Sequence, residues 1–585
     1  MDPPFGYSEA VFSYSTIAKA LLGPSFIACA ACAGPRMIPD VIAAPQVFYA
    51  VTGEIALSRG DPRAAALQYT AAATGGSDLA LMARASEVTA DSLQPSLSEI
   101  VDVRWISLAP DSVDAHRAYA KAALALQKIP QSAEQYRIVL TTSPRGADAE
   151  FADLETELGA VDNIFGARQL ADRLAVAFPE SAAAHRLQAF AAMRADDPAA
   201  AVQSFTAALA FTPAPDTAAV SGGAAPAQVG ARREIMLGLW RARILSGDVQ
   251  EPLAESRALA EAQASPANLL DYALLLLAAQ QNDAAIAQLE TLTAQPDSAP
   301  VALRLLGLVE FQENKLDAAS HRFTELLTTG KFVDDCFYYL GLIAERRADL
   351  ERALRLYAQV QNGDNAVAAL LRASNILQAH GAAPAAQELL DHLIEDDPGR
   401  APEVVAARAK IFADLGDPQQ AIDVLDRGLL QYPDNVDIRY AMASTYEQQG
   451  RVGAALHELK DVLKSRPDDP AAMNAYGYTL ADHNRELGHA RQLLERAYAA
   501  APRNAAILDS MGWVLYRQGH GEQALPYLKA AYTDDRGGDI GAHLGEVLWQ
   551  LGRHDEADRI WTEAGEVDVQ NRVLNATRQR LHASK

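Results

Sequence analysis

Cysteine, aromatic residues and long apolar runs are all scarce in this chain of 585 residues. The three cysteines, two of them Cys29 and Cys32 near the N-terminus, give no disulfide framework. Aromatic residues make up only 7% of the chain, and no stretch sustains the apolar–polar alternation of a β-strand. Lys and Arg number 51 against 75 Asp and Glu, and the net charge of −24 disfavours nucleic-acid binding and charge-driven docking to an acidic membrane.

Motifs for catalysis and for cofactor binding are missing as well. The sequence has no Gly-rich phosphate loop and no nucleophile elbow. Three histidines gather near the C-terminus at His520, His543 and His554, but their spacing does not match metal ligands on one helical turn. We therefore expect a protein that is not an enzyme, with no cofactor and no metal site.

The most prominent feature that the chain does contain is an internal repeat of about 34 residues. Prolines recur at this interval in two series, Pro110, Pro144, Pro179 and Pro213, then Pro398, Pro433, Pro467 and Pro502. Close packing of two helices requires a small residue 24 or 25 residues before the proline position of each repeat. The residues at that position are Gly53, Ser86, Ala120, Glu155, Ala189, Trp240, Ala273, Gly307, Gly341, Ser374, Ala409, Ala443, Gly477, Gly512 and Gly545. Twelve or 13 residues after each of these, alanine predominates, which suits two closely packed helices.

This repeat resembles the tetratricopeptide repeat, in which two antiparallel helices, A and B, stack on those of the next unit. Gly60-Asp61-Pro62 and Gly416-Asp417-Pro418 fit the turn between the two helices: a glycine ends helix A, an aspartate caps helix B and a proline opens it. We predict an all-α fold, a right-handed α-solenoid of about 15 tetratricopeptide-type helix pairs. Only Glu155 and Trp240 depart from the small residue that close packing requires, and the register near Glu155 is expected to slip.

The register of the repeats also suggests how the chain is divided. Residues 1–40 lie outside the repeats, and residues 41–212 form an N-terminal repeat block. Residues 213–232, rich in Pro, Gly and Ala, are predicted to form a linker or hinge, and residues 233–585 form the C-terminal repeat block.

The N-terminal segment has features of an export signal. Lys19 precedes an apolar stretch, Leu21–Ala31, that is too short to cross a bilayer as a helix. Cys29 and Cys32 each follow an alanine and are candidates for lipidation, which would anchor the protein to the outer membrane and place it in the periplasm. An ordinary cytoplasmic N-terminal extension is the alternative. Any membrane contact is expected only through this lipid anchor.

Candidate binding residues lie on the A helices of the last repeats, which line the concave wall of such a solenoid. These positions mix aromatic and polar side chains, a composition that suits recognition of other proteins. The predicted partner-binding residues are Tyr440, Asn474, Tyr478, Asp509, Trp513, Tyr516, Arg517, His543, Glu546 and Trp549. The alternative for Trp513 and Trp549 is that they pack between adjacent A helices or under the C-terminal helix.

Three C-terminal runs, Asn474–Asp482, Leu508–Tyr516 and His543–Trp549, carry a closer resemblance. They are similar to a family of proteobacterial envelope tetratricopeptide proteins, among them outer-membrane lipoprotein adaptors of a carboxyl-terminal processing protease. The resemblance implies a non-catalytic scaffold that brings this periplasmic protease together with substrates such as peptidoglycan hydrolases. The family's lipidation junction is matched poorly here, since Phe26 or Cys29 stands where leucine is usual.

Two further readings of the chain remain. A scaffold for exopolysaccharide export or envelope assembly would use the same wall and the same location. A repeat-bearing enzyme would need a catalytic domain, and the segments outside the repeats are too short to supply one.

Overall fold

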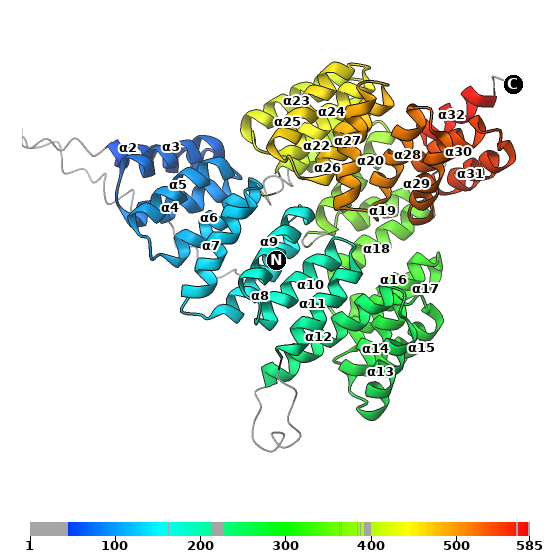
Figure 1. Cartoon of the computed structure of the whole chain (residues 1–585), viewed down its shortest axis with the longest axis horizontal. Helices are drawn as coiled ribbons and strands as arrows, with labels where there is room; N and C mark the ends of the chain where they lie inside the picture. The colour runs from blue at the N-terminus through cyan, green and yellow to red at the C-terminus, as the bar shows by residue number, and fades with distance from the viewer. Residues whose placement is uncertain are drawn as a thin grey trace, which may run out of the picture.

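The computed structural model describes residues 45–161, 163–212, 226–361, 363, 365–382, 384–386, 388–390, 399, 401–568 and 571–582. Helix is the only regular secondary structure within these ranges, and successive antiparallel helices stack along the chain into a coiled array (Figure 1). The prediction of an all-α solenoid is therefore confirmed. The predicted leader, residues 1–40, lies outside the described residues, as do Cys29 and Cys32.

The helices alternate between A and B positions, as the repeat predicts. The A helices are α2 (Pro45–Ser58), α4 (Leu79–Asp91), α6 (Val113–Ala125), α8 (Ala147–Ala160), α10 (Ala182–Arg194), α12 (Pro226–Leu245), α14 (Pro266–Ala278), α16 (Ala299–Gln312), α18 (Val333–Arg346), α20 (Asn365–Ala379), α22 (Ala401–Asp414), α24 (Val436–Gln448), α26 (Pro470–Asp482), α28 (Ala505–Arg517) and α30 (Gly538–Gln550). The B helices are α3 (Pro62–Gly75), α5 (Pro95–Leu108), α7 (Ile129–Thr142), α9 (Ile164–Ala177), α11 (Pro198–Ala210), α13 (Gln250–Ala262), α15 (Asn282–Thr293), α17 (Leu316–Thr328), α19 (Leu350–Tyr357), α23 (Pro418–Gln431), α25 (Val452–Ser465), α27 (Leu487–Ala500), α29 (Gly521–Asp534) and α31 (His554–Val567), followed by a terminal helix α32 (Arg572–His582).

The turns between A and B helices follow from local sequence. Gly60 and Gly416 both adopt a positive φ, 69° and 79°, which glycine reaches at little cost. The side chain of Asp61 then accepts a hydrogen bond from the Ala64 amide, and Asp417 caps α23 in the same way. These contacts confirm the predicted Gly-Asp-Pro turns.

Small residues in the A helices seat a large residue of the paired B helix. A Cβ atom added at Gly307 would lie 2.8 Å from the Phe323 ring, and one added at Gly53 would lie 2.7 Å from the Tyr69 ring. We call this B-helix residue, sixteen positions after the small one (seventeen in the Gly477 unit), the anchor position. It is occupied by Tyr69, Asp102, Tyr136, Ala171, Phe205, Ser256, Leu289, Phe323, Tyr357, Leu390, Leu425, Leu459, Leu494, Leu528 and Trp561.

At the two positions that depart from the small-residue rule, the large side chain is in helix A and the small one is at the anchor position of helix B. Trp240 is buried on α12, and the residue at its anchor position is the small Ser256; its indole N–H donates to Glu255 at 2.7 Å. Glu155 on α8 is half-buried opposite Ala171 and pairs with Arg186 at 2.9 Å. The expected slip of register near Glu155 is therefore unnecessary, because a small anchor and a paired guanidinium make room for the carboxylate.

The stack continues past the predicted linker. Residues 213–225 are outside the described ranges, but α12 begins at Pro226, inside the segment 213–232 that was expected to be a linker. The Phe205 ring of α11 packs against Gly238 of α12, and Arg232 donates to the Thr212 carbonyl at 3.0 Å. Helices on the two sides of this segment thus share one core.

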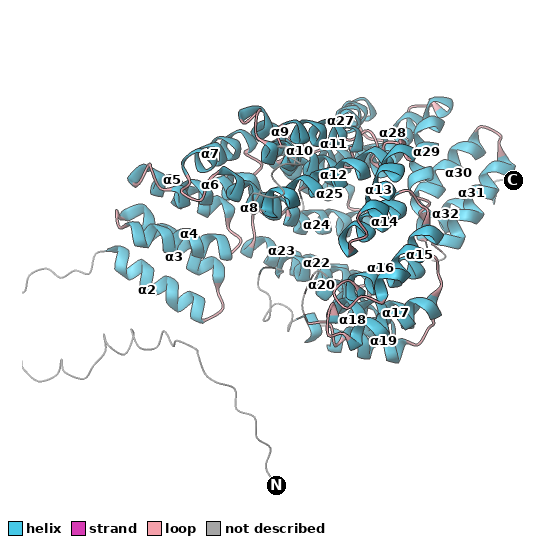
Figure 2. Ribbon diagram, turned by 90° about the horizontal axis from the view of Figure 1, so that it is seen from below, coloured by secondary structure: helices cyan, strands magenta, loops and turns pink. Residues whose placement is uncertain are grey.

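The solenoid coils far enough for distant repeats to touch. The Gln94 side-chain amide, just before α5, donates to the Gln431 carbonyl at the end of α23 at 2.7 Å, and the Ser96 amide donates to Asp434 at 3.2 Å. Further along, Arg503 and Asp196 form an ion pair at 3.6 Å. We call this line of contact the seam; it joins α4–α11 to α23–α28, and Figure 2 shows these two stretches of helices from a second direction.

Membrane-spanning helices are not seen in the described part of the chain, where no helix combines sufficient length and apolar character. Cys336 on α18 is buried in the packed core that α16, α17 and α18 share.

Candidate protein-binding surface

The predicted binding residues lie on four consecutive A helices, α24, α26, α28 and α30. Helix α26 packs on α28 and α28 on α30, and residues of α24 and α26 share apolar clusters, so side chains from neighbouring repeats meet along one wall. The sequence analysis thus placed these residues on the correct helices. Their accessibility differs from one residue to the next, because most of them contact each other.

Trp513 lies between helices rather than on an open surface. It is 4% exposed, its ring stacks on His543 with centroids 4.0 Å apart, and its N–H donates to Asp482 at 3.1 Å. His543 in turn contacts Asp509 through Nδ1 at 2.8 Å. Helix-to-helix packing thus covers Asp509 and His543, which were predicted to face a partner. For Trp513, the alternative that it packs between adjacent A helices is the one observed.

The charge of Asp509 acts on His543. Burial by itself would lower the pKa of the imidazole, but the Asp509 carboxylate together with Asp482 and Asp539 outweighs burial and raises the pKa of His543 above its ordinary value. When His543 is protonated, the two residues form a buried ion pair that links α28 to α30.

Glu546 and Trp549 are covered by the terminal helix. Glu546 accepts a hydrogen bond from the Tyr516 hydroxyl at 3.1 Å and pairs with Arg580 of α32 at 2.6 Å. Trp549 lies 4.9 Å from the His582 ring of the same helix and is also buried. The alternative that Trp549 packs under the C-terminal helix is the one observed.

Five predicted residues keep part of their surface, Tyr440, Asn474, Tyr478, Tyr516 and Arg517. Tyr478 is half-buried beside His543, and Arg517 donates to the Asp482 carbonyl at 2.6 Å. Tyr440 and Asn474, on α24 and α26, are also half-buried, and the Tyr440 hydroxyl and the Asn474 carbonyl oxygen lack a hydrogen-bond partner among the described residues. Burial raises the pKa of the Tyr440 and Tyr478 phenols above the ordinary value and that of Tyr516 to about 12.

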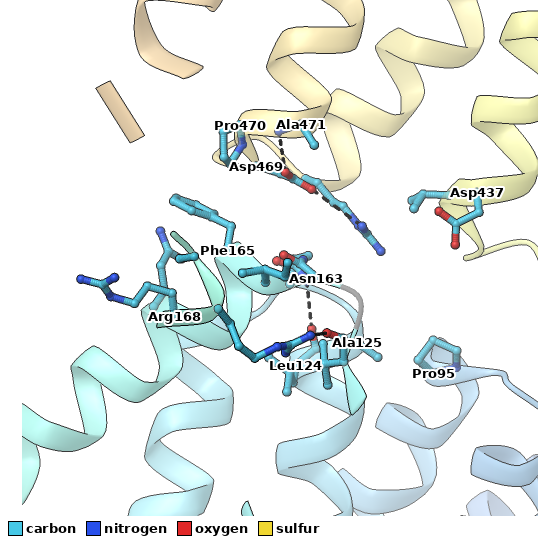
Figure 3. Close-up of a pocket in the computed structure, with 18 of the residues that line it drawn as sticks. Pro95, Leu124, Ala125, Asn163, Phe165, Arg168, Asp437, Asp469, Pro470 and Ala471 are labelled. Carbon is cyan, nitrogen blue, oxygen red and sulfur yellow. Dashed lines mark hydrogen bonds and ion pairs between the residues drawn. The ribbon is translucent and has the colours of Figure 1, made fainter. Parts of the chain in front are cut away.

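A large cavity opens along the seam. Its volume is 1610 Å³, and its walls come from the first repeats and from the repeats that coil back onto them. Figure 3 shows Phe165 and Arg168 on one side, with Asp469 and Pro470 opposite them. Tyr440 and Asn474 line this cavity too, and they connect it to the predicted wall.

Of the residues that line this cavity, the sequence analysis predicted only Tyr440 and Asn474 to bind a partner, and the most unusual one it missed is Asp102 on α5. It occupies the anchor position, where the other units have apolar or uncharged residues, and it is 1% exposed. Neither carboxylate oxygen has a hydrogen-bond partner among the described side chains and backbone. Burial raises the pKa of Asp102 to about 7, and the Ser86 side chain acts on that pKa in the opposite direction. A charged residue sixteen positions after the small one was the signal that could have found it.

The described side chains offer binding groups and no assembled metal centre. Within the described ranges no three His, Cys, Asp or Glu side chains are placed to hold a metal ion together. The wall and the cavity instead combine rings, carboxylates and amides, which suit recognition of a polypeptide.

Comparison with protein families finds tetratricopeptide repeats at three places in the chain. One family model, described as "Tetratricopeptide repeat", matches residues 412–476, and a second model with the same description matches residues 270–320 and 510–559. These segments coincide with helix pairs that show the packing described above.

The relatives found in sequence are repeat proteins. A "TPR repeat-containing protein" of Pseudomonas aeruginosa is 35% identical over 214 residues, which cover 37% of this chain and 36% of the relative. "Tetratricopeptide repeat protein 21B" of Homo sapiens is 27% identical over 257 residues, 42% of this chain and 19% of that protein. The chain thus spans about a third or less of the length of these curated relatives.

Among solved structures, a thermophilic tetratricopeptide protein of Thermus thermophilus is 23% identical, and the match covers 31% of this chain and 98% of that one. Its TM-score is 0.28, a likeness too slight to bear on the argument. The helix pairs, the matched segments and the Pseudomonas relative together give one conclusion: this chain carries tetratricopeptide repeats and has a bacterial homologue that carries them, and such repeats indicate a protein-interaction scaffold.

Proposed function

We propose that this protein is a non-catalytic adaptor of the bacterial cell envelope, which brings a periplasmic carboxyl-terminal processing protease together with substrates such as peptidoglycan hydrolases. In this proposal the chain resides in the periplasm and is anchored to the outer membrane through a lipid on Cys29 or Cys32.

The observation that carries the proposal is the wall built by three runs that resemble the envelope adaptors. Asn474–Asp482, Leu508–Tyr516 and His543–Trp549 lie on the neighbouring helices α26, α28 and α30. Buried contacts such as Trp513 on His543 hold these helices in a fixed arrangement. Tyr478 and Arg517 remain half-buried on this framework and supply side chains of the types that dominate protein interfaces.

The test is a crosslinked pull-down from envelope fractions of the source bacterium, followed by mass spectrometry. Wild-type protein is expected to recover the processing protease and cell-wall hydrolases. The double variant Tyr478→Ala with Arg517→Ala should recover much less of both, because it removes accessible side chains of the wall. Trp513 is left intact, since its removal would open the packing between α28 and α30.

A matched control changes the outer face of the array. His457 and Lys460 are exposed on α25, a B helix, and their double alanine variant should recover as much protease as the wild type. Recovery of exopolysaccharide-export subunits in place of the protease would refute the proposed partnership. Mass analysis of the mature N-terminus tests the anchor, because an N-terminus without lipid would contradict that part of the proposal.

A further inference from the structure

The cavity along the seam lies outside the predicted wall except for Tyr440 and Asn474. At 1610 Å³ it exceeds the roughly 300–1,000 Å³ of pockets that hold small molecules. Contacts between distant repeats border it, including Gln94 with Gln431 and Arg503 with Asp196. It is therefore a space that only the coiling of the solenoid creates, and it is large enough for a polypeptide segment.

The lining of this cavity is acidic. More than twice as many acidic as basic side chains line it. The basic ones already have partners: Lys121 with Glu157 at 3.1 Å, Arg168 with Asp172 at 3.1 Å, Arg194 with the Val161 carbonyl at 3.1 Å, Arg466 with Asp469 at 3.7 Å, and Arg503 with Asp196 at 3.6 Å. The protein thus leaves an excess of negative charge facing the cavity.

Helix ends of both kinds meet the cavity. The A helices α4, α6 and α8 end there, at Ala90, Ala125 and Val161, whereas α5, α9, α24, α26 and α28 begin there. Carboxyl ends of helices carry partial negative charge and amino ends partial positive charge, so the two offset each other. The excess of negative charge in the cavity therefore comes from its side chains.

Asp102 marks the point where a positive charge would bind. It lines the cavity, yet both of its oxygens are buried without a hydrogen-bond partner among the described residues. In the other repeats the anchor position holds an aromatic ring, an aliphatic side chain or the small Ser256, all uncharged, so packing alone does not explain a carboxylate there. A buried carboxylate is stable only when it is neutral or paired.

We propose that the seam cavity binds an extended basic segment of a partner polypeptide, with a lysine or arginine side chain of that segment reaching Asp102. The carboxyl group is recessed below the cavity surface, so the positive charge must arrive on a long side chain. The proposal rests on the scaffold function above, but it does not depend on the protease as partner.

The test is a fluorescence-anisotropy titration with two fluorescein-labelled peptides. One peptide alternates lysine and serine, and the other has glutamate in place of lysine. The titration is run at about 0.15 M salt, where general attraction to the acidic chain is largely screened. The lysine peptide should bind and the glutamate peptide should not. Asp102→Asn should weaken binding of the lysine peptide at least tenfold at pH 8.

Two further variants keep the outcome decisive. Asp102→Leu restores an anchor residue found in other repeats, so it should fold well and still lose the peptide; circular dichroism checks the fold. Asp283→Asn removes an exposed acid on α15, outside the cavity, and should bind like the wild type.

Wild-type affinity in Asp102→Leu, or an equal loss in Asp283→Asn, would overturn the proposal. If spermidine alone binds as tightly as the peptide, the cavity is a polyamine site and the proposal is wrong. Because the probe is a synthetic peptide, a failed protease pull-down would leave this result unchanged, so the two proposals fail independently.

Discussion

Replacing Asp102 by asparagine should stabilise the repeat around it, by an amount that grows with pH. Burial raises the pKa of Asp102 to about 7, whereas an unfolded aspartate titrates near 3.9. Between these two values the folded chain holds a proton that the unfolded chain does not, so stability falls as pH rises from about 4 to 7. Above pH 7 the folded carboxylate is ionised, and the full cost of burying it remains.

The magnitude follows from the size of the shift. A difference of about 3 pKa units corresponds to about 4 kcal/mol in full, of which about 1.5 kcal/mol is already present at pH 5. The neutral amide of Asp102→Asn does not titrate. The variant should therefore gain about 2.5 kcal/mol more over the wild type at pH 8 than at pH 5.

Hydrogen exchange is the suitable assay, because repeat arrays open locally and a single unfolding energy is poorly defined for them. Comparing variant and wild type at the same pH cancels the intrinsic dependence of exchange on pH. The variant-to-wild-type ratio of protection in α4 and α6 should rise roughly 70-fold from pH 5 to pH 8. Asp283→Asn should leave this ratio constant, and a constant ratio in Asp102→Asn would refute the reasoning.

Three other predictions follow from contacts in the array. Gly545→Ala should destabilise the last repeat by about 1–3 kcal/mol, since the added methyl group collides with the buried Trp561 ring. Gly488→Ala on α27, where an added methyl group meets nothing within 4 Å, should not destabilise that helix. Hydrogen exchange in α30 and α31 for the first variant, and in α27 for the second, checks both predictions. Because the pKa of His543 is raised in the folded protein, its pair with Asp509 stabilises α28 and α30 fully below about pH 6.5. This stabilisation is lost as pH rises through the folded pKa. Hydrogen exchange in α30 should therefore speed up more with pH in the wild type than in His543→Gln. An equal dependence in both proteins would count against the pair. The double variant Gln94→Ala with Asp434→Ala should loosen the seam, because it removes two hydrogen bonds across it that contribute about 1 kcal/mol each. Small-angle scattering should then detect a larger radius of gyration. An unchanged radius would show that other contacts hold the seam.

The repeat predicted most of the helix pairs because its information is local. Gly307 and Gly341 mark helix A, and in eight of the units a proline such as Pro433 or Pro467 marks the expected end of helix B. Neither feature depends on distant parts of the chain. The departures at Glu155 and Trp240 were visible in the sequence. How the fold accommodates Glu155 and Trp240 was not visible, because that depends on the small residues Ala171 and Ser256 that lie opposite them.

The candidate site was predicted less well than the fold. The helices that carry Trp513 and Trp549 were placed correctly, but their burial depends on His543 and on α32, which the periodicity does not position. Asp102 was missed because the sequence was searched for binding residues only in the last repeats. Partner binding by Tyr440, Asn474, Tyr478, Tyr516 and Arg517 remains a prediction.

By itself, the sequence determined that this chain is a stack of paired helices, since small residues and prolines at fixed intervals act within each unit and on its neighbour. Only the tertiary structure decided that the stack coils back on itself. The bond between Gln94 and Gln431 joins residues 337 positions apart, and it exists because small rotations between repeats add up along the array. No single repeat encodes that sum, so the seam, its cavity and the burial of the wall emerge only once the whole solenoid is assembled.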